Sequence, residues 1–193
     1  MKTLIIHPKD QSTAFLETIY STIPKADKTV ITSGISLAGV NELIRTHEEV
    51  IFCGHGSMLG LFSVGQFNGV SEYDYIINQE TADLLNNKKK IIAIWCYAAM
   101  YIQDFLLNPA FCTDMFISEM GESNAFGLKD ITEIQIEESN ACFANELSTL
   151  IHKKPSEIYQ QFQIGAYSQL TKTNPIAAYN FKRLFCSKEE FIN

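Results

Sequence analysis

A histidine and a cysteine each follow an apolar, strand-like run of this chain. The first run, Val50–Cys53, gives way to His55 between two glycines, and the second, Ile91–Trp95, ends at Cys96. A thiolate attacks a carbonyl carbon while a nearby imidazole accepts and returns the proton. Side chains that follow neighbouring parallel strands meet at one edge of an α/β sheet, where ligands bind. The pair is therefore a candidate for nucleophilic catalysis by a thiol.

Backbone amides around this pair suit the same chemistry. An amide at the start of a helix after Cys96 favours the thiolate and helps to hold an oxyanion, and Gly56 lets backbone approach a substrate closely. The simpler alternative is a sharp strand exit at His55 and an ordinary buried thiol at Cys96, since buried cysteine is common. The expected position of both residues at strand ends favours the functional interpretation.

The elements that must position the pair follow a regular α/β pattern. Apolar runs predict strands at Thr3–Ile6, Thr29–Thr32 and Glu49–Cys53, with helices between them, the second over Ser36–Arg45. The continuous apolar character of Ile91–Trp95 predicts a strand that is covered on both faces. Together they predict a three-layer α-β-α sandwich with a mainly parallel central sheet.

The remainder of the chain is predicted to be mostly helical. Glycines punctuate Leu59–Tyr75, which is typical of a hairpin or covering loop. We expect a fifth strand at Asp114–Ser118 and a loop at Glu119–Ser123, and we favour a last strand over a helix at Ile176–Phe185. Further helices are expected over Gln79–Asn87, Cys96–Leu107, Glu138–Ile151 and Ser156–Leu170.

Length, charge and cysteine usage exclude several classes of protein. The chain has 193 residues and a net charge of -7, and its cationic residues cluster only at Lys88–Lys90, which argues against nucleic-acid binding. No apolar run is long enough for a secretory signal or a membrane span of ~20 residues. Five irregularly spaced cysteines do not make a disulfide framework. We expect one cytoplasmic domain over residues 1–193, without a nucleic-acid or membrane partner.

The order of these elements resembles a known family. An apolar run ending in His55-Gly56, followed by one ending in Cys96, is similar to the caspase-like cysteine peptidases of clan CD, which include caspases, metacaspases, gingipains and separases. In that family the histidine follows the third strand and the cysteine the fourth strand of a caspase-hemoglobinase fold. The resemblance covers roughly residues 1–123. It implies that His55 is the catalytic acid or base, that Cys96 is the nucleophile, and that the amides of Gly56 and Cys96 form an oxyanion hole.

The same resemblance implies a hydrolase, a thiol protease that acts on a protein or peptide substrate without a cofactor. Asp10 after the first strand, and Glu119 and Glu122 after the expected fifth strand, fall on the same rim and are candidates for binding a basic side chain of the substrate. Alternatively, they are solvated carboxylates of an acidic protein. His7, at the end of the first strand, would orient His55 or line the pocket, although a structural role is the simpler interpretation.

Bulky neighbours of the thiol support a second hypothesis. Trp95 and Tyr97 flank Cys96, whereas many family members have small or polar residues there. These side chains favour a catalytically inactive caspase-like module that binds other proteins or acts as a scaffold. A pocket filled by Trp95, Tyr97 or Phe67 would support the module. The peptidase instead requires His55 and Cys96 to face each other across a cleft, with Cys96 as the thiol most readily alkylated at neutral pH.

Two other site types are chemically possible. Cys53, His55 and Cys96 are suitable zinc ligands, but no second ligand pair occurs at matching spacing, so we expect no metal. A flavodoxin-like nucleotide binder is the remaining option. Its support is weak, because Ser33–Ser36 matches neither the Walker lysine motif nor the dinucleotide glycine pattern.

Overall fold

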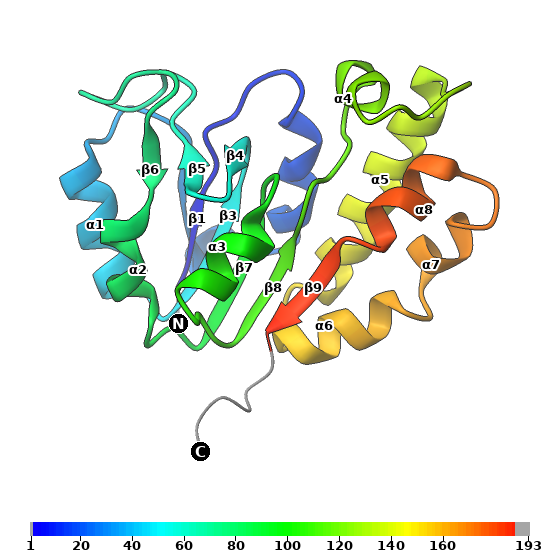
Figure 1. Ribbon diagram of the computed structural model, residues 1–193. Coiled ribbons are helices and arrows are strands. Elements are labelled where there is room, and N and C mark those ends of the chain that lie inside the picture. The colour runs from blue at the N-terminus through cyan, green and yellow to red at the C-terminus, as the bar shows by residue number, and fades with distance from the viewer. Residues whose placement is uncertain (1, 188–193) are drawn as a thin grey trace.

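A six-stranded, mostly parallel sheet forms the centre of the molecule (Figure 1). The structure is a computed structural model that describes residues 2–187. The strands lie in the order β2-β1-β3-β7-β8-β9, and all neighbouring pairs are parallel except β8 and β9. Their bounds are β1 Thr3–Ile6, β2 Lys28–Ile31, β3 Glu49–Cys53, β7 Lys90–Ile94, β8 Ala110–Thr113 and β9 Leu184–Ser187. The predicted α/β class with a mainly parallel sheet is confirmed.

Successive residues of the central strands alternate between two hydrophobic cores, one on each face of the sheet. In β3, Val50 and Phe52 belong to one core, whereas Ile51 and Cys53 belong to the other. This alternation follows from the two-residue period of a strand. A strand that is apolar at every position therefore needs cover on both faces, as predicted for Ile91–Trp95.

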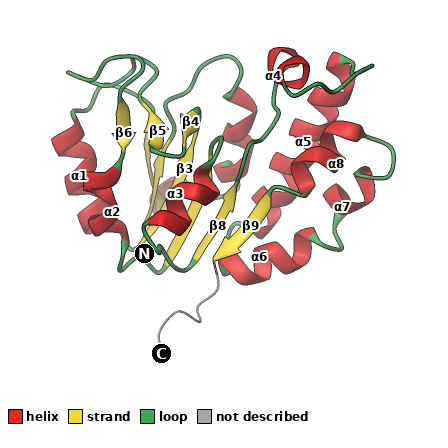
Figure 2. Cartoon of the chain, in the orientation of Figure 1, coloured by secondary structure: helices red, strands yellow, loops and turns green. Residues whose placement is uncertain are grey.

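Helices provide that cover on both faces (Figure 2). The helices that pack on one face are α1 Leu37–Thr46, α2 Gln79–Leu85 and α3 Ala98–Asp104. The helices that pack on the other face are the 3-10 helix η1 Ala14–Tyr20, α5 Glu133–Leu150, α6 Pro155–Phe162, α7 Ala166–Leu170 and α8 Pro175–Phe181. The short helices η2 Lys25–Asp27 and α4 Met120–Ala125 complete the set. Within residues 2–187, no helix is both long and apolar enough to span a bilayer.

The glycine-rich segment after His55 folds as a small antiparallel sheet. Its strands are β4 Gly56–Ser57, β5 Gly60–Phe62 and β6 Tyr75–Ile77. Leu61 of β5 is fully buried and belongs to the same core as α1, α2 and α3. The small sheet is thus packed onto the main sheet, and it begins directly at the residue that follows His55.

The predicted fifth strand was placed too late in the sequence. The strand is β8, Ala110–Thr113, which pairs with β7 directly after Pro109. Residues 114–118 are apolar enough to resemble a strand, but their backbone pairs elsewhere. The amide and the carbonyl of Ile117 both hydrogen bond to the side chain of Asn180, at 2.8 Å each. A side-chain amide thus replaces a neighbouring strand.

Two further predictions were wrong, one shortly after β8 and one near the carboxyl end. The expected loop at Glu119–Ser123 contains most of α4, which begins with a reciprocal capping box between Glu119 and Glu122. Most of the segment Ile176–Phe185, expected to be a strand, belongs to helix α8, and Asn174 caps this helix by accepting hydrogen bonds from the amides of Ile176 and Ala177. The last strand, β9, begins only at Leu184 and runs antiparallel to β8.

The strand order creates one place for a site. Strands β2 and β3 lie on opposite sides of β1, so the chain segments after β1 and β3 diverge at the carboxyl edge of the sheet. Such a reversal of strand order is where open α/β sheets leave a crevice for a ligand. Asp10 follows β1, and His55 follows β3.

Candidate active site

A tight exit from β3 places His55 at the carboxyl edge of the sheet. Gly54 has a φ of +142°, which side-chain-bearing residues rarely adopt, and its amide donates to the carbonyl of Ile94 on β7 at 3.1 Å. Gly56 is equally constrained, because a Cβ there would lie 2.3 Å from the ring of Trp95. The two glycines that flank His55 therefore let the chain turn against β7 and its following residue.

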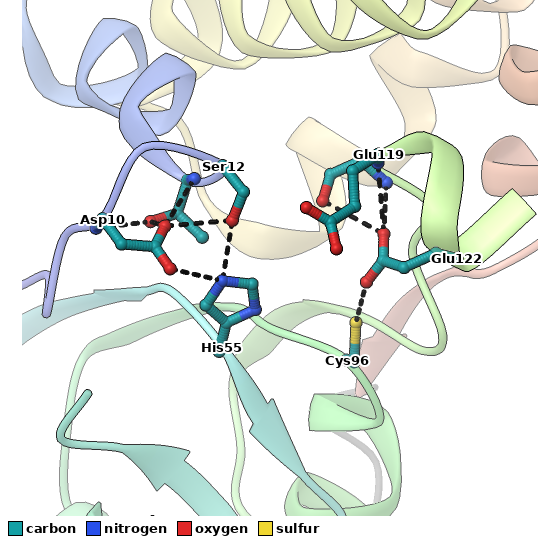
Figure 3. A network of polar contacts seen from close by, with 8 residues as sticks. Asp10, Ser12, His55, Cys96, Glu119 and Glu122 are labelled. Carbon is teal, nitrogen blue, oxygen red and sulfur yellow. Dashed lines mark hydrogen bonds and ion pairs between the residues drawn. The ribbon is translucent and has the colours of Figure 1, made fainter. Parts of the chain in front are cut away.

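His55 is held by a carboxylate through a single ring nitrogen. Its Nε2 lies 2.9 Å from Asp10 Oδ2 and 2.8 Å from Ser12 Oγ (Figure 3). The other oxygen of Asp10 accepts hydrogen bonds from the amide and hydroxyl of Thr13 and from the hydroxyl of Ser12. Partial burial raises the pKa of Asp10, but these hydrogen bonds and the His55 ring outweigh it, and the pKa is lowered.

This pairing fixes the tautomer of His55. An ionised carboxylate only accepts hydrogen bonds, so Nε2 carries the proton that Asp10 accepts. The Nδ1 atom is then the ring nitrogen with a free lone pair, available to accept a proton from a nucleophile. Ser12 is not a serine-protease nucleophile, because its hydroxyl donates to Asp10 and shares the same ring nitrogen as the carboxylate.

Cys96 lies where β7 turns into α3. Tyr97 adopts a left-handed conformation with a φ of +68°, and the helix begins at the next residue. The Cys96 thiol donates to the carbonyl of Phe116 at 3.5 Å and faces Glu122 Oε1 at 3.9 Å. Burial and the charge of Glu122 raise the pKa of Cys96 to about 12. The thiol is therefore protonated at neutral pH in this arrangement.

Glu122 is itself firmly held. Its Oε2 accepts from the amide of Ser118 at 2.7 Å, from the Ser118 hydroxyl at 3.2 Å and from the amide of Glu119 at 3.3 Å. Burial raises the pKa of Glu122, and these hydrogen bonds offset part of that effect. One carboxylate thus caps α4 with one oxygen and faces the Cys96 thiol with the other (Figure 3).

His55 and Cys96 line the same small cavity. Its volume of about 20 Å³ has room for about one water molecule. Within residues 2–187, the hydrogen bonds of the His55 ring go to Asp10 and Ser12, and those of the thiol go to Phe116 and Glu122. The structure thus brings the two predicted catalytic residues together without joining them directly.

The bulky side chains suspected of filling the pocket lie mainly elsewhere. Trp95 is 2% exposed, packs edge-on against Phe52 and Tyr101, and donates from Nε1 to the carbonyl of Ser57 at 3.0 Å. Trp95 also lines the cavity, whereas Tyr97 and Phe67 do not. Much of the remaining lining comes from two segments, Thr13, Phe15 and Leu16 at the start of η1, and Phe116, Ser118 and Glu122 after β8.

A larger hollow opens beside the Asp10 end of the site. Its volume is about 630 Å³, and Asp10 and Ser12 form one wall of it. The lining includes Glu119, one of the residues predicted to bind substrate, and it has no Lys, Arg or His. The full lining is Asp10, Gln11, Ser12, Ser118, Glu119, Met120, Glu133, Ile136 and Glu137.

Two of these carboxylates were missed from the sequence. Glu133 and Glu137 lie four residues apart on the first turns of α5, so they share one face of that helix. The predicted helix began at Glu138, which hid this spacing. Of the other two predicted substrate-binding carboxylates, Asp10 lines this hollow and also contacts His55, whereas Glu122 faces Cys96.

The remaining candidate residues have structural surroundings. His7 is fully buried and its Nδ1 lies 2.9 Å from the hydroxyl of Tyr20. Burial lowers the pKa of His7 to about 4, so the ring is neutral at pH 7. Cys53 is fully buried, and burial raises its pKa. Among the described residues, no group of three or more His, Cys, Asp or Glu side chains is placed to hold a metal ion.

No protein-family model and no curated protein matches this sequence. The function must therefore be argued from the geometry. That geometry consists of an oriented imidazole, a partly buried thiol and an acidic hollow at one edge of a parallel sheet.

Proposed function

We propose that this protein is a caspase-like cysteine peptidase in which Cys96 is the nucleophile and His55 transfers protons. The observation that carries the proposal is the shared cavity, in which an imidazole oriented by Asp10 meets a thiol. The strand order supports it, because His55 follows the third strand of the main sheet and Cys96 the fourth. This is the placement that the resemblance to clan CD peptidases implies.

The reaction would begin with transfer of the Cys96 proton to His55 Nδ1. The thiolate then forms a bond to the carbonyl carbon of the peptide, and the carbonyl oxygen takes up the negative charge. Amides of Gly56 and Cys96 are the proposed donors to that oxyanion. As the carbon–nitrogen bond breaks, His55 gives its proton to the departing amine, which leaves a thioester on Cys96.

Hydrolysis of the thioester completes the cycle. A water molecule gives a proton to His55 and bonds to the acyl carbon, and the carbon–sulfur bond breaks. The sulfur recovers the proton from His55, and the carboxylic acid leaves. Asp10 acts as a positioning residue, because it stabilises the imidazolium that forms twice in this cycle and keeps Nδ1 directed to the reacting atoms.

The acidic hollow supports a preference for substrates with a basic side chain. Glu119, Glu133 and Glu137 line it beside Ser12, and no cationic side chain offsets their charge within that lining. An arginine or lysine would gain favourable electrostatic interactions there, whereas the phosphates of a nucleotide would be repelled. The same charge therefore disfavours the flavodoxin-like alternative.

A catalytically inactive binding module is the second candidate, and the closed cavity favours it. A space of about 20 Å³ admits no peptide bond, and a thiol with a pKa of about 12 is not a nucleophile at neutral pH. For the module, this conformation is the working state. For the peptidase, it is a state that must open.

Cleavage of a peptide library separates the two candidates. The native protein is compared with Cys96→Ala and with Cys142→Ala, a matched control that removes a thiol on α5 outside the cavity. The peptidase predicts that cleavage is lost in Cys96→Ala and kept in Cys142→Ala. Equal cleavage by Cys96→Ala and the native protein would exclude Cys96 as the nucleophile.

A further inference from the structure

The carboxylate of Glu122 faces the Cys96 thiol. In the active state of a cysteine peptidase, a carboxylate at this position would oppose formation of the thiolate. A negative charge 3.9 Å from Sγ disfavours the thiolate, and the carbonyl of Phe116 accepts a hydrogen bond from the neutral thiol. Both groups belong to the segment 116–122, which lines the cavity together with Thr13, Phe15 and Leu16. Within this lining, residues 116–122 make the hydrogen bonds to the thiol.

Glu122 also holds that segment in place. Three hydrogen bonds join its Oε2 to the amide and hydroxyl of Ser118 and to the amide of Glu119, which fixes the first turn of α4. The helix has only six residues, and Phe126 after it is 43% exposed. Much of the order of this short helix thus depends on the same carboxylate that faces the thiol.

We propose that Glu122 is a positioning residue that keeps Cys96 as a neutral thiol in a latent state, and that α4 must move away before Cys96 can react. The chemistry of the contact is specific to this residue. Glu119, the other half of the capping box, is exposed and lines the acidic hollow rather than the cavity of Cys96. Movement of α4 would open the cavity and remove the negative charge from the thiol together.

Other titratable groups near Cys96 do not replace Glu122. His55 lines the same cavity, and Asp114 after β8 adds a weaker effect in the same direction as Glu122. Tyr179 of α8 is close enough to interact with both Cys96 and Tyr97. Of these groups, Glu122 is the carboxylate in contact with the sulfur. Removing its charge should therefore lower the pKa of Cys96 more than any other single change.

The test measures alkylation of each cysteine in the whole chain and needs no substrate. Native protein, Glu122→Gln and the matched control Glu119→Gln are exposed to iodoacetamide at several pH values, and modification of each cysteine is quantified by mass spectrometry. A pKa that falls by one unit gives ~10-fold more thiolate at neutral pH. We expect Cys96 of Glu122→Gln to react at least ~10-fold faster than in the native protein, and Cys96 of Glu119→Gln to react at the native rate.

Buried Cys53 and Cys112 report whether the fold survives. If they too become reactive in Glu122→Gln, the variant has opened globally, and Ser118→Ala is used in its place. That change removes one hydrogen bond to Glu122 and keeps its charge, so a smaller increase confined to Cys96 is expected. An unchanged rate at Cys96, in Glu122→Gln or in this replacement, would overturn the proposal.

The proposal of a latent state rests on the proposed peptidase function, but experiments can contradict either proposal without contradicting the other. Faster alkylation of Cys96 in Glu122→Gln, without cleavage of any peptide, would support the restraint by Glu122 and contradict the peptidase function. Cleavage that depends on Cys96, together with an alkylation rate that is the same in Glu122→Gln and the native protein, would support the peptidase function and contradict the restraint by Glu122.

Discussion

Each half of the site pairs a reactive residue with a carboxylate, and the two carboxylates have opposite consequences. Asp10 lies beside an imidazole and stabilises its protonated form, whereas Glu122 lies beside a thiol and destabilises its ionised form. The pKa of Asp10 is lowered, and the pKa of Glu122 is raised. The imidazole half thus has the arrangement that the proposed catalysis requires, and the thiol half opposes it.

The difference shows that the effect of an acidic residue depends on the group it faces. Both carboxylates follow strands of the same sheet and reach the same edge. The hydrogen bonds around Asp10 come mainly from Thr13 and favour an ionised carboxylate that is partly exposed to water. Those around Glu122 hold it inward, against a thiol that is largely removed from water.

The largest effect is expected where the imidazole half is broken. Asp10→Asn keeps the size of the side chain but removes the charge and the fixed tautomer of His55, so we expect kcat to fall by ~10²-fold or more. The control is Lys9→Gln. Lys9 is next to Asp10 in the sequence but pairs with Glu17 rather than with His55, so this variant should retain activity. Steady-state kinetics on a cleaved peptide provides the measurement. Retention of native kcat by Asp10→Asn would show that the contact is only structural.

The acidic hollow gives a substrate-dependent effect of intermediate size. Glu133→Gln combined with Glu137→Gln should lower kcat/KM for peptides with arginine or lysine by ~10-fold, because each lost charge removes part of the attraction. Peptides without a basic residue should be cleaved as before. Glu157→Gln, an exposed position on α6, is the control. An equal loss for both peptide classes would mean that the hollow does not select the side chain.

Ser12 allows a finer test of the same half. Its hydroxyl touches the same nitrogen of His55 as Asp10, but it supplies no charge. Ser12→Ala should therefore lower kcat only ~5-fold, in line with about 1 kcal/mol for the hydrogen bond between Ser12 and His55. A loss as large as that of Asp10→Asn would contradict the assignment of Asp10 as the residue that orients the ring.

The smallest effects concern stability, and they have opposite signs in the two halves. The folded pKa of Asp10 is lowered, so its contribution to stability is present above the ordinary value of 3.8 and is lost as the pH falls through the folded pKa. The folded pKa of Glu122 is raised, so its contribution is lost as the pH rises above the ordinary value of 4.5.

Denaturation with urea across this pH range measures both contributions. Asp10→Asn should flatten the loss of stability on the acid side, whereas Glu122→Gln should flatten the decline on the side above pH 4.5. If stability depends on pH in the same way in both variants, the proposed opposite effects of Asp10 and Glu122 on stability are contradicted.

The sequence was sufficient to place the two reactive residues, because each follows an uninterrupted apolar run. The runs Glu49–Cys53 and Ile91–Trp95 correspond to β3 and β7 within a residue at either end. Apolar runs are set by burial on both faces of a strand, and this signal is local. The edge at which His55 and Cys96 meet then follows from parallel strand pairing.

A local sequence pattern could not predict which side chains contact His55 and Cys96. The sequence did not reveal that turns and caps, fixed by hydrogen bonds of Asp10 and Glu122 themselves, direct these carboxylates to His55 and Cys96. The strand expected at Asp114–Ser118 was wrong for a related reason, since Asn180, far along the chain, satisfies the backbone of Ile117. Contacts between distant segments decide such positions, and the sequence of either segment alone does not reveal them.

Covalent trapping tests the central claim most directly. The native protein, His55→Ala and Cys96→Ala are each incubated with a chloromethyl ketone that carries a short peptide ending in arginine, and the adduct is located by mass spectrometry. The account predicts one adduct, on Cys96, that forms in the native protein each time α4 moves away from the thiol and is strongly slowed in His55→Ala. An adduct on any other cysteine, or one whose rate is independent of His55, would contradict it.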